Sequence, residues 1–151
     1  MKYKLLENDT KKIGNTTLYR IQYIRDVCYI KSGTLGGYIE KETNFFQSDN
    51  SLILENAQVY GDALVYGNAQ VSGNARVSGN ARVYGNALVS KSPIIIMNFK
   101  HTICITETHI FIGCEGHTIE HWKKNISKIG MKNGYSKDEI KKVIKILKCF
   151  I

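Results

Sequence analysis

A six-residue period runs through the middle of the chain, from Asn56 to Ser90. Its units read Asn-Ala-Gln-Val-Tyr-Gly, Asp-Ala-Leu-Val-Tyr-Gly, Asn-Ala-Gln-Val-Ser-Gly, Asn-Ala-Arg-Val-Ser-Gly, Asn-Ala-Arg-Val-Tyr-Gly and Asn-Ala-Leu-Val-Ser-Lys. A fixed short period is typical of a solenoid, in which each unit buries its apolar face only against the next coil. The repeat therefore limits the fold more strongly than any other feature of the sequence.

The spacing inside each unit predicts a short strand followed by a corner. Valines recur at strict intervals of six, which excludes the spacing of three and four that a helix needs. Ala and Val stand two residues apart, so on a strand they share one side and the residue between them points to the other. Gly followed by Asn or Asp favours a turn, because these residues tolerate positive φ.

Three units would complete one triangular coil, so that residues three units apart stack about 4.8 Å from each other along the axis. This register predicts uniform columns of like side chains. The expected columns are Val59 with Val77 and Ile95, Val65 with Val83, Ile53 with Val71 and Val89, Tyr66 with Tyr84, Asn56 with Asn74, and Asn68 with Asn86.

These Asn-Ala-x-Val-x-Gly units resemble the hexapeptide repeats of left-handed parallel β-helices. The resemblance implies the left hand, whereas the general preference for right-handed crossovers would favour the opposite one. Many proteins of this class are trimers with parallel axes. The resemblance therefore also implies a homo-oligomer, with a trimer favoured, and the apolar side chains expected on the faces suit such contacts.

Two segments that flank the repeat resemble those of small phage and prophage proteins of an uncharacterised family. The first contains Leu18-Tyr19-Arg20-Ile21 and Leu35-Gly36-Gly37-Tyr38-Ile39-Glu40. The second runs from Ile112 to Trp122 and continues through Ile129-Gly130 and Asn133-Gly134-Tyr135. The resemblance implies an architecture and a phage or prophage origin, but no activity.

The N-terminal flank predicts a β-hairpin cap. Tyr19, Ile21 and Tyr23 alternate with polar residues, and Tyr3 to Leu6 is the expected partner strand, joined to them through the polar stretch 7–16. Degenerate units at 44–49 and 50–55 would extend the solenoid, with Gln47 and Ile53 in the place of valine. We therefore expect a β cap over 1–43 and the β-helix over 44–97.

The remaining residues, 98–151, predict strands and two helices that complete a single compact domain. Ile- and Thr-rich stretches at 93–99 and 101–114 alternate as strands do and would cover the last coil. Thr118 can cap a first helix that stops at Gly130. Ser136 and Glu139 form a capping box for a second helix.

Composition and charge limit the function classes. The chain has 151 residues, 43% of them hydrophobic, and a formal net charge of +8. The sequence predicts neither a signal peptide nor a membrane span. Its four cysteines show no paired spacing, so we expect reduced thiols in the cytoplasm of a host cell.

The catalytic and metal-binding alternatives have weak support. Many hexapeptide-repeat proteins are acyltransferases with a histidine base on a protruding loop, but the repeat here contains no histidine and no insertion. An acyltransferase-like enzyme is the alternative function, and we expect neither an enzyme nor a cofactor. Cys114, His117 and His121 are a weak zinc candidate, because three ligands in one short run lack a fourth.

Two groups of residues are candidates for binding a partner. Exposed tyrosines and arginines of the repeat are Tyr60, Tyr66, Tyr84, Arg76 and Arg82. Lysines on one face of the last helix are Lys137, Lys141, Lys142, Lys145 and Lys148. A lysine stripe suits nucleic acid, although a solvated helix face or an acidic protein surface fits it equally.

The sequence thus predicts a non-enzymatic binding protein that acts on a host protein or ribonucleoprotein complex. The most specific version, drawn by analogy with small phage proteins, is an anti-defence inhibitor of the anti-CRISPR type. A structural or assembly role is a third alternative. Nucleic acid stays an alternative partner, and no membrane partner is expected.

Overall fold

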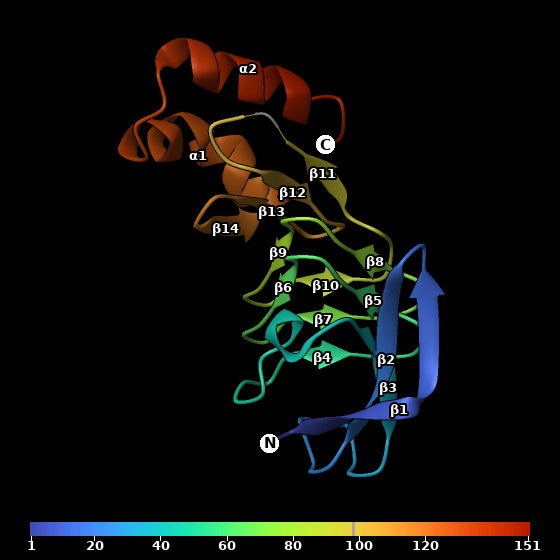
Figure 1. The fold of residues 1–151 in the computed structure, drawn as a ribbon. Coiled ribbons are helices and arrows are strands. Elements are labelled where there is room, and N and C mark those ends of the chain that lie inside the picture. The colour runs from blue at the N-terminus through green and yellow to red at the C-terminus, as the bar shows by residue number, and fades with distance from the viewer. Residues whose placement is uncertain (98) are drawn as a thin grey trace. The chain divides into compact units, whose positions relative to one another are not determined.

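The computed structural model describes residues 1–97 and 99–151 (Figure 1). The fold is mainly β, and its described part has two α-helices near the C-terminus. The chain forms two compact units, Met1–Gly116 and His117–Ile151. The first unit contains all the repeats. The boundary expected between residues 97 and 98 involves residue 98, which lies outside the described residues.

The repeats form strands of two residues each, one per unit, in three parallel ladders (Figure 1). One ladder is β4-β7-β10, the second is β6-β9, and the third joins β5 and β8 to the N-terminal strand β3 (Leu35–Ile39). The strands are β4 (Leu52–Ile53), β5 (Gln58–Val59), β6 (Leu64–Val65), β7 (Gln70–Val71), β8 (Arg76–Val77), β9 (Arg82–Val83) and β10 (Leu88–Val89).

The expected register of three units per coil is confirmed. Val59 pairs with Val77 and Val65 with Val83, while Val71 lies between Ile53 and Val89. The repeat valines and alanines are at most 1% exposed, so these columns form the core. Outside the core, the rings of Tyr66 and Tyr84 stack 4.9 Å apart, and Asn68 Nδ2 donates to Asn86 Oδ1 over 3.2 Å.

Two of the expected column positions are wrong. Ile95 lies in β11 (Ile94–Ile96) and pairs antiparallel with Cys104 of β12 (Ile103–Ile105), because the last unit ends in Lys91 where the other units have glycine. At the other end, Phe45 and not Gln47 bridges to Val65. The side-chain amide of Gln47 instead bonds backbone atoms of the first residues.

The N-terminal hairpin is confirmed, but its strands are longer and its turn is shorter than expected. β1 (Tyr3–Ile13) pairs antiparallel with β2 (Thr16–Tyr23), and the residues between them form a tight turn. Gly14 has a φ of 57°, a conformation that favours glycine. An irregularity between Leu6 and Thr10 lets the polar stretch 7–9 stay within the strand.

A glycine pair and an arginine join this hairpin to the solenoid. A Cβ at Gly37 would come within 2.5 Å of the Ala57 carbonyl oxygen, and one at Gly36 within 2.6 Å of the Ile53 carbonyl oxygen. The Arg20 guanidinium donates to the carbonyl oxygens of Gly36 and Glu55 over 2.8 and 2.7 Å. β3 can therefore pair with β5, because Gly36 and Gly37 have no side chains that would collide with the neighbouring coil.

Side chains supply acceptors to the amides that the coils leave unpaired. In the first complete coil, carboxylates of Glu40, Asp49 and Glu55 accept from the corner amides of Gly61, Gly67 and Gly73. In the last coil, the hydroxyls of Ser92 and Thr108 accept from the amides of Arg76 and Leu88, and Glu107 accepts from Ser90. Satisfied amides at both ends are poor templates for further strand pairing.

Strands follow the repeat as expected, and they pair antiparallel with one another. β12 pairs antiparallel with β13 (His109–Ile112), and β14 (Glu115–Thr118) follows β13 in the same four-stranded sheet. Cys104 and Phe111, from β12 and β13, belong to the same buried cluster as the repeat valines. This sheet therefore covers apolar side chains of the last coil.

The second unit contains two α-helices, α1 (Ile119–Lys132) and α2 (Lys137–Leu147). The expected caps are confirmed, because Thr118 accepts from the His121 amide and Ser136 forms a capping box with Glu139. The expected stop at Gly130 is wrong, since α1 continues to Lys132. A Cβ at Gly130 would lie 2.7 Å from the Ile140 side chain, so this glycine permits close packing of the two helices. Neither helix has the length and apolar character needed to cross a membrane.

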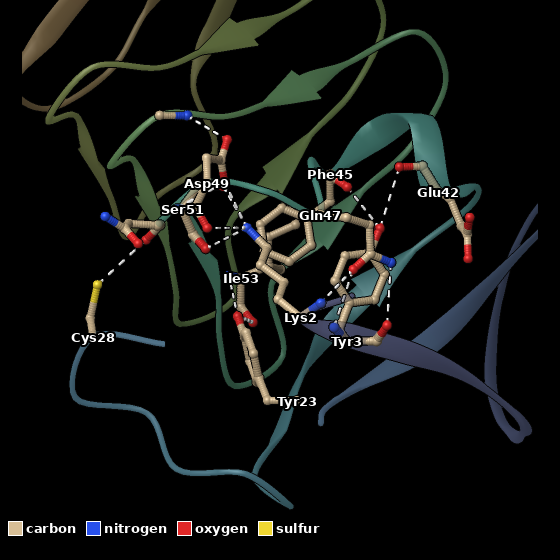
Figure 2. Close-up of polar contacts among 12 residues, drawn as sticks. Lys2, Tyr3, Tyr23, Cys28, Glu42, Phe45, Gln47, Asp49, Ser51 and Ile53 are labelled. Carbon is tan, nitrogen blue, oxygen red and sulfur yellow. Dashed lines mark hydrogen bonds and ion pairs between the residues drawn. The ribbon is translucent and has the colours of Figure 1, made fainter. Parts of the chain in front are cut away.

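A buried lysine holds the N-terminal residues against the segment 45–51 (Figure 2). Lys2 Nζ lies 2.7 Å from Asp49 Oδ1, donates to the carbonyl and hydroxyl oxygens of Ser51, and lies 3.9 Å from the centre of the Phe45 ring. Burial lowers the pKa of Lys2, against the opposing hydrogen bond to Asp49. The short 3-10 helix η1 (Glu42–Asn44) lies between β3 and β4 on the chain, and its Asn44 Nδ2 donates to the carbonyl oxygens of Gly61 and Ala63 at a corner of the repeat.

Replacing Lys2 should destabilise the protein far more than replacing its exposed neighbour Lys4. We expect Lys2→Met to lower the free energy of unfolding by about 2 to 4 kcal/mol, because the partly buried Asp49 carboxylate loses its cation. Lys4→Met should cost less than about 0.5 kcal/mol. Chemical denaturation of both variants measures this, and equal effects would contradict the anchoring role.

The same pair predicts an acid-sensitive stability. Burial alone would raise the pKa of Asp49, but hydrogen bonds from Lys2 and Ser51 outweigh it and hold the pKa below its ordinary value. Unfolding raises this pKa, so the unfolded chain binds the proton first and stability falls as the pH drops below about 4. Asp49→Asn should flatten that part of the stability profile, measured by denaturation between pH 2 and 6.

Candidate interaction face

The outer side of the β6–β9 ladder carries two columns of large side chains. Leu64 and Tyr66 alternate with the buried Val65 and point outward, and Arg82 and Tyr84 repeat this arrangement one coil later. We call these four outward side chains the β6–β9 face. The register places arginine over leucine and tyrosine over tyrosine.

Aromatic rings continue the tyrosine column in both directions. Phe46 lies 5.5 Å from Tyr66, and Phe111 lies 4.6 Å from Tyr84, measured between ring centres. The Tyr84 hydroxyl donates to the Cys114 carbonyl oxygen over 3.0 Å. A Cβ at Gly116 would lie 2.5 Å from both the Tyr84 and the Phe111 rings, so only a glycine lets the chain pass this close to them.

Stacking restricts which atoms of this aromatic column reach solvent. Tyr66 and Tyr84 are nearly parallel, with 13° between their planes, so each covers a face of the other. Burial raises the pKa of Tyr84 to about 12 and raises that of Tyr66, while the Arg82 charge opposes both shifts. Both tyrosines are therefore neutral donors at physiological pH, beside a cation.

A cleft of about 380 Å³ opens beside Arg82. Leu64, Cys104 and Phe111 supply its apolar part. Its polar lining comes from Asp62, Asn80, Arg82, His101, Thr102 and Cys114. The ring of His101 lies against Gly113, where a Cβ would come within 3.0 Å of it. The cleft is thus built where the end of the β6–β9 ladder meets the strands that follow the repeat.

Arg82 is the uncompensated charge of this cleft. Its side chain is exposed, and within residues 1–97 and 99–151 no carboxylate lies within ion-pair distance of it. The nearby carboxylate of Asp62 lies 3.2 Å from Lys41 Nζ instead. Arg82 can therefore offer its planar set of N–H donors to an anion from outside the chain.

The two cysteines of the cleft differ in reactivity. Burial raises the pKa of Cys104 to about 12, although the Arg82 backbone amide donates to its sulfur and opposes the shift. Cys114 is exposed.

The weak zinc candidates show no metal-binding geometry in the described residues. His117 and His121 stack with their ring centres 4.4 Å apart and 22° between their planes, an arrangement that directs faces and not nitrogen atoms at each other. No group of three or more His, Cys, Asp or Glu side chains suited to a metal occurs in the described part of the chain.

The structure separates the other predicted binding residues into three places. Tyr66, Tyr84 and Arg82 share the β6–β9 face. Arg76 lies on β8, in a different ladder, and Tyr60 directly follows β5 of that ladder. The predicted lysines belong to the second unit, where all are exposed: Lys137, Lys141, Lys142, Lys145 and Lys148.

Sequence reasoning missed the residues that extend the face and build the cleft. Phe46 stands twenty residues before Tyr66, outside the exact register of eighteen, and Phe111 comes from an antiparallel strand. His101 reaches the cleft only through the chain reversal after the repeat, whereas Asn80 is the corner residue of the unit that contains Arg82. The spacing of eighteen residues between Tyr66 and Tyr84 was a usable signal for the column, but nothing in the sequence marked the cleft.

Comparison with known families agrees with the observed ladders. A family model described as YdcK Beta solenoid repeat matches three consecutive segments, 57–73, 69–83 and 81–95. The chain is a β-solenoid repeat protein. The matched segments span β5 to β10 and include the β6–β9 face but neither flank. No curated protein matches the chain.

Thiol labelling tests the geometry of the cleft in this solenoid. At neutral pH an alkylating reagent should modify the exposed Cys28, Cys114 and Cys149 and leave the buried Cys104 unmodified. Cys104 should react only after denaturation. Intact-mass and peptide mapping measure this, and labelling of Cys104 in the native protein would contradict the closed packing under β12.

Proposed function

We propose that this β-solenoid repeat protein is a non-enzymatic binding protein whose β6–β9 face docks a host protein. The face combines an aromatic column that runs across neighbouring coils with a cation that has no partner in the described chain. Aromatic residues and arginine are the types enriched at protein interfaces and among their energetically dominant contacts. The continuous column Phe46–Tyr66–Tyr84–Phe111 beside Arg82 is the observation that carries this proposal.

The stacking of the column favours a protein over a single-stranded nucleic acid. Nucleic acids that bind to aromatic side chains insert their bases against ring faces. Here the faces of Tyr66 and Tyr84 cover each other and the Tyr84 hydroxyl already donates to Cys114, so ring edges and the Tyr66 hydroxyl are what a partner meets. A rigid column with its side chains already ordered also lowers the entropy cost of docking.

The finer points of the proposal come from the resemblance to phage and prophage proteins. We propose a left-handed solenoid and a homotrimer in the cytoplasm of the host, acting as an anti-defence inhibitor of the anti-CRISPR type. The exposed lysines of α2 are a second surface for an acidic or ribonucleoprotein partner. This step is an analogy between families and not a deduction from a catalytic or binding geometry.

Charge reversal on neighbouring ladders tests which face docks the partner. The tagged protein captures its partner from a bacterial lysate, and Arg82→Glu should reduce the captured amount at least about tenfold by placing a carboxylate beside the aromatic column. Arg76→Glu is the matched control, because Arg76 holds the same place in the preceding Asn-Ala-Arg-Val unit, is also exposed and lies in a different ladder. Quantitative mass spectrometry measures the captured protein.

A triple variant separates the helical surface from the solenoid face. Lys141→Glu with Lys142→Glu and Lys145→Glu should leave capture nearly unchanged if the β6–β9 face dominates. Loss of capture in the triple variant and not in Arg82→Glu would reject the proposed face and assign the partner to the lysines of α2.

A further inference from the structure

We propose that the cleft beside Arg82 binds a carboxylate, and that its occupant is an aspartate or glutamate side chain of the docked protein. The inference rests on the proposed function, because it supposes that a protein approaches the β6–β9 face. It adds the chemistry of the segment that this protein inserts. The cleft lies next to the aromatic column, so one partner segment can reach both.

The size of the cleft leaves room for an acidic side chain together with the chain next to it, and not for a large cofactor. A volume of about 380 Å³ lies near the lower end of the range for small-molecule sites, roughly 300 to 1,000 Å³. Leu64 and Phe111 provide apolar walls for the methylene groups of an acidic side chain, while the polar groups lie around Arg82. A long ligand such as coenzyme A would extend far outside it.

The charges of the cleft select an anion. Arg82 has no ion pair in the described residues, whereas Asp62 is already held by Lys41. A guanidinium offers two parallel N–H donors that match the two oxygens of a carboxylate. Asn80 and Thr102 add neutral groups that can hydrogen-bond the same anion or the backbone next to it.

Asp62 also favours a carboxylate over a phosphate. A phosphate monoester carries nearly two negative charges at neutral pH, and the repulsion by a nearby carboxylate grows with that charge. A single cation beside one acid suits a singly charged ligand better. The described lining of the cleft offers no second arginine or lysine to offset a dianion.

The aromatic column predicts what stands beside the acidic residue. Arg82 and Tyr84 stand two residues apart on the same side of the chain at β9, and Tyr66 lies under Tyr84 one coil earlier. Apolar side chains that flank the acidic residue would therefore contact the tyrosine edges. The occupant is thus an acidic residue with an apolar neighbour, on a segment that lies across the face.

Small blocked amino acids test the cleft without the unknown partner. The probes are N-acetylglutamate α-amide, its neutral isostere N-acetylglutamine amide, and inorganic phosphate, each titrated into the full-length protein. We expect saturable changes in the amide ¹H–¹⁵N signals of Gly113 and Cys114, and slower alkylation of Cys114, with the glutamate probe only. Arg82→Gln should weaken this binding at least about tenfold, and the matched Arg76→Gln should leave it unchanged.

Each outcome decides the ligand assignment. Equal binding of the glutamate and glutamine probes, stronger binding of phosphate, or an unchanged affinity in Arg82→Gln would overturn it. The capture experiment is independent of these titrations. If Arg82→Glu abolishes capture while the glutamate probe fails to bind, the docking face stands and only the carboxylate assignment is lost. If the probe binds and capture is unaffected, the carboxylate site stands and the proposed function is wrong.

Discussion

The hydrogen-bond register between successive coils is the constraint on which the rest of the first unit depends. Each strand contributes only two residues, so a single ladder pair has little stability of its own. Three ladders in one register stack valine on valine and alanine on alanine, and this buries an apolar column that no single coil could form. A slip of one residue would exchange the buried valines for Leu64 and Arg82.

That register makes the two ends of the solenoid the critical places. Edge amides need acceptors, and the chain supplies carboxylates at the first coil and hydroxyls and a carboxylate at the last. At the N-terminal end, Asp49 has two roles, because it accepts from the Gly67 amide and also forms an ion pair with the buried Lys2. The flanks are therefore parts of the same hydrogen-bond system as the repeats.

The register also determines what the surface can recognise. Side chains one coil apart lie at the spacing of neighbouring strands, so identical rings stack and a cation in one coil lies over an apolar residue in the next. The β6–β9 face gains an ordered aromatic column and loses the free ring faces that base stacking would need. The cleft then arises because the strands after the repeat turn back across this face and bring His101 and Cys114 to Arg82.

The sequence by itself determined the elements whose cause is local or periodic. The six-residue spacing gave the strands, the register of three units per coil and the columns of Val59, Val65 and Val71, and local capping residues gave the starts of both helices. The alternation of apolar and polar residues predicted the N-terminal hairpin, but the position of its turn became clear only from the positive φ of Gly14.

Only the tertiary structure decided the features that depend on contacts between distant residues. Gly130 suggested a helix stop, but the close approach of Ile140 gives that glycine its role. Gln47 held the place of valine in the repeat, yet the larger Phe45 fills the core beside Val65 because it is apolar. The pairing of Lys2 with Asp49 and the cleft at Arg82 join segments that no period or spacing connects, since burial and charge are satisfied in space and not along the chain.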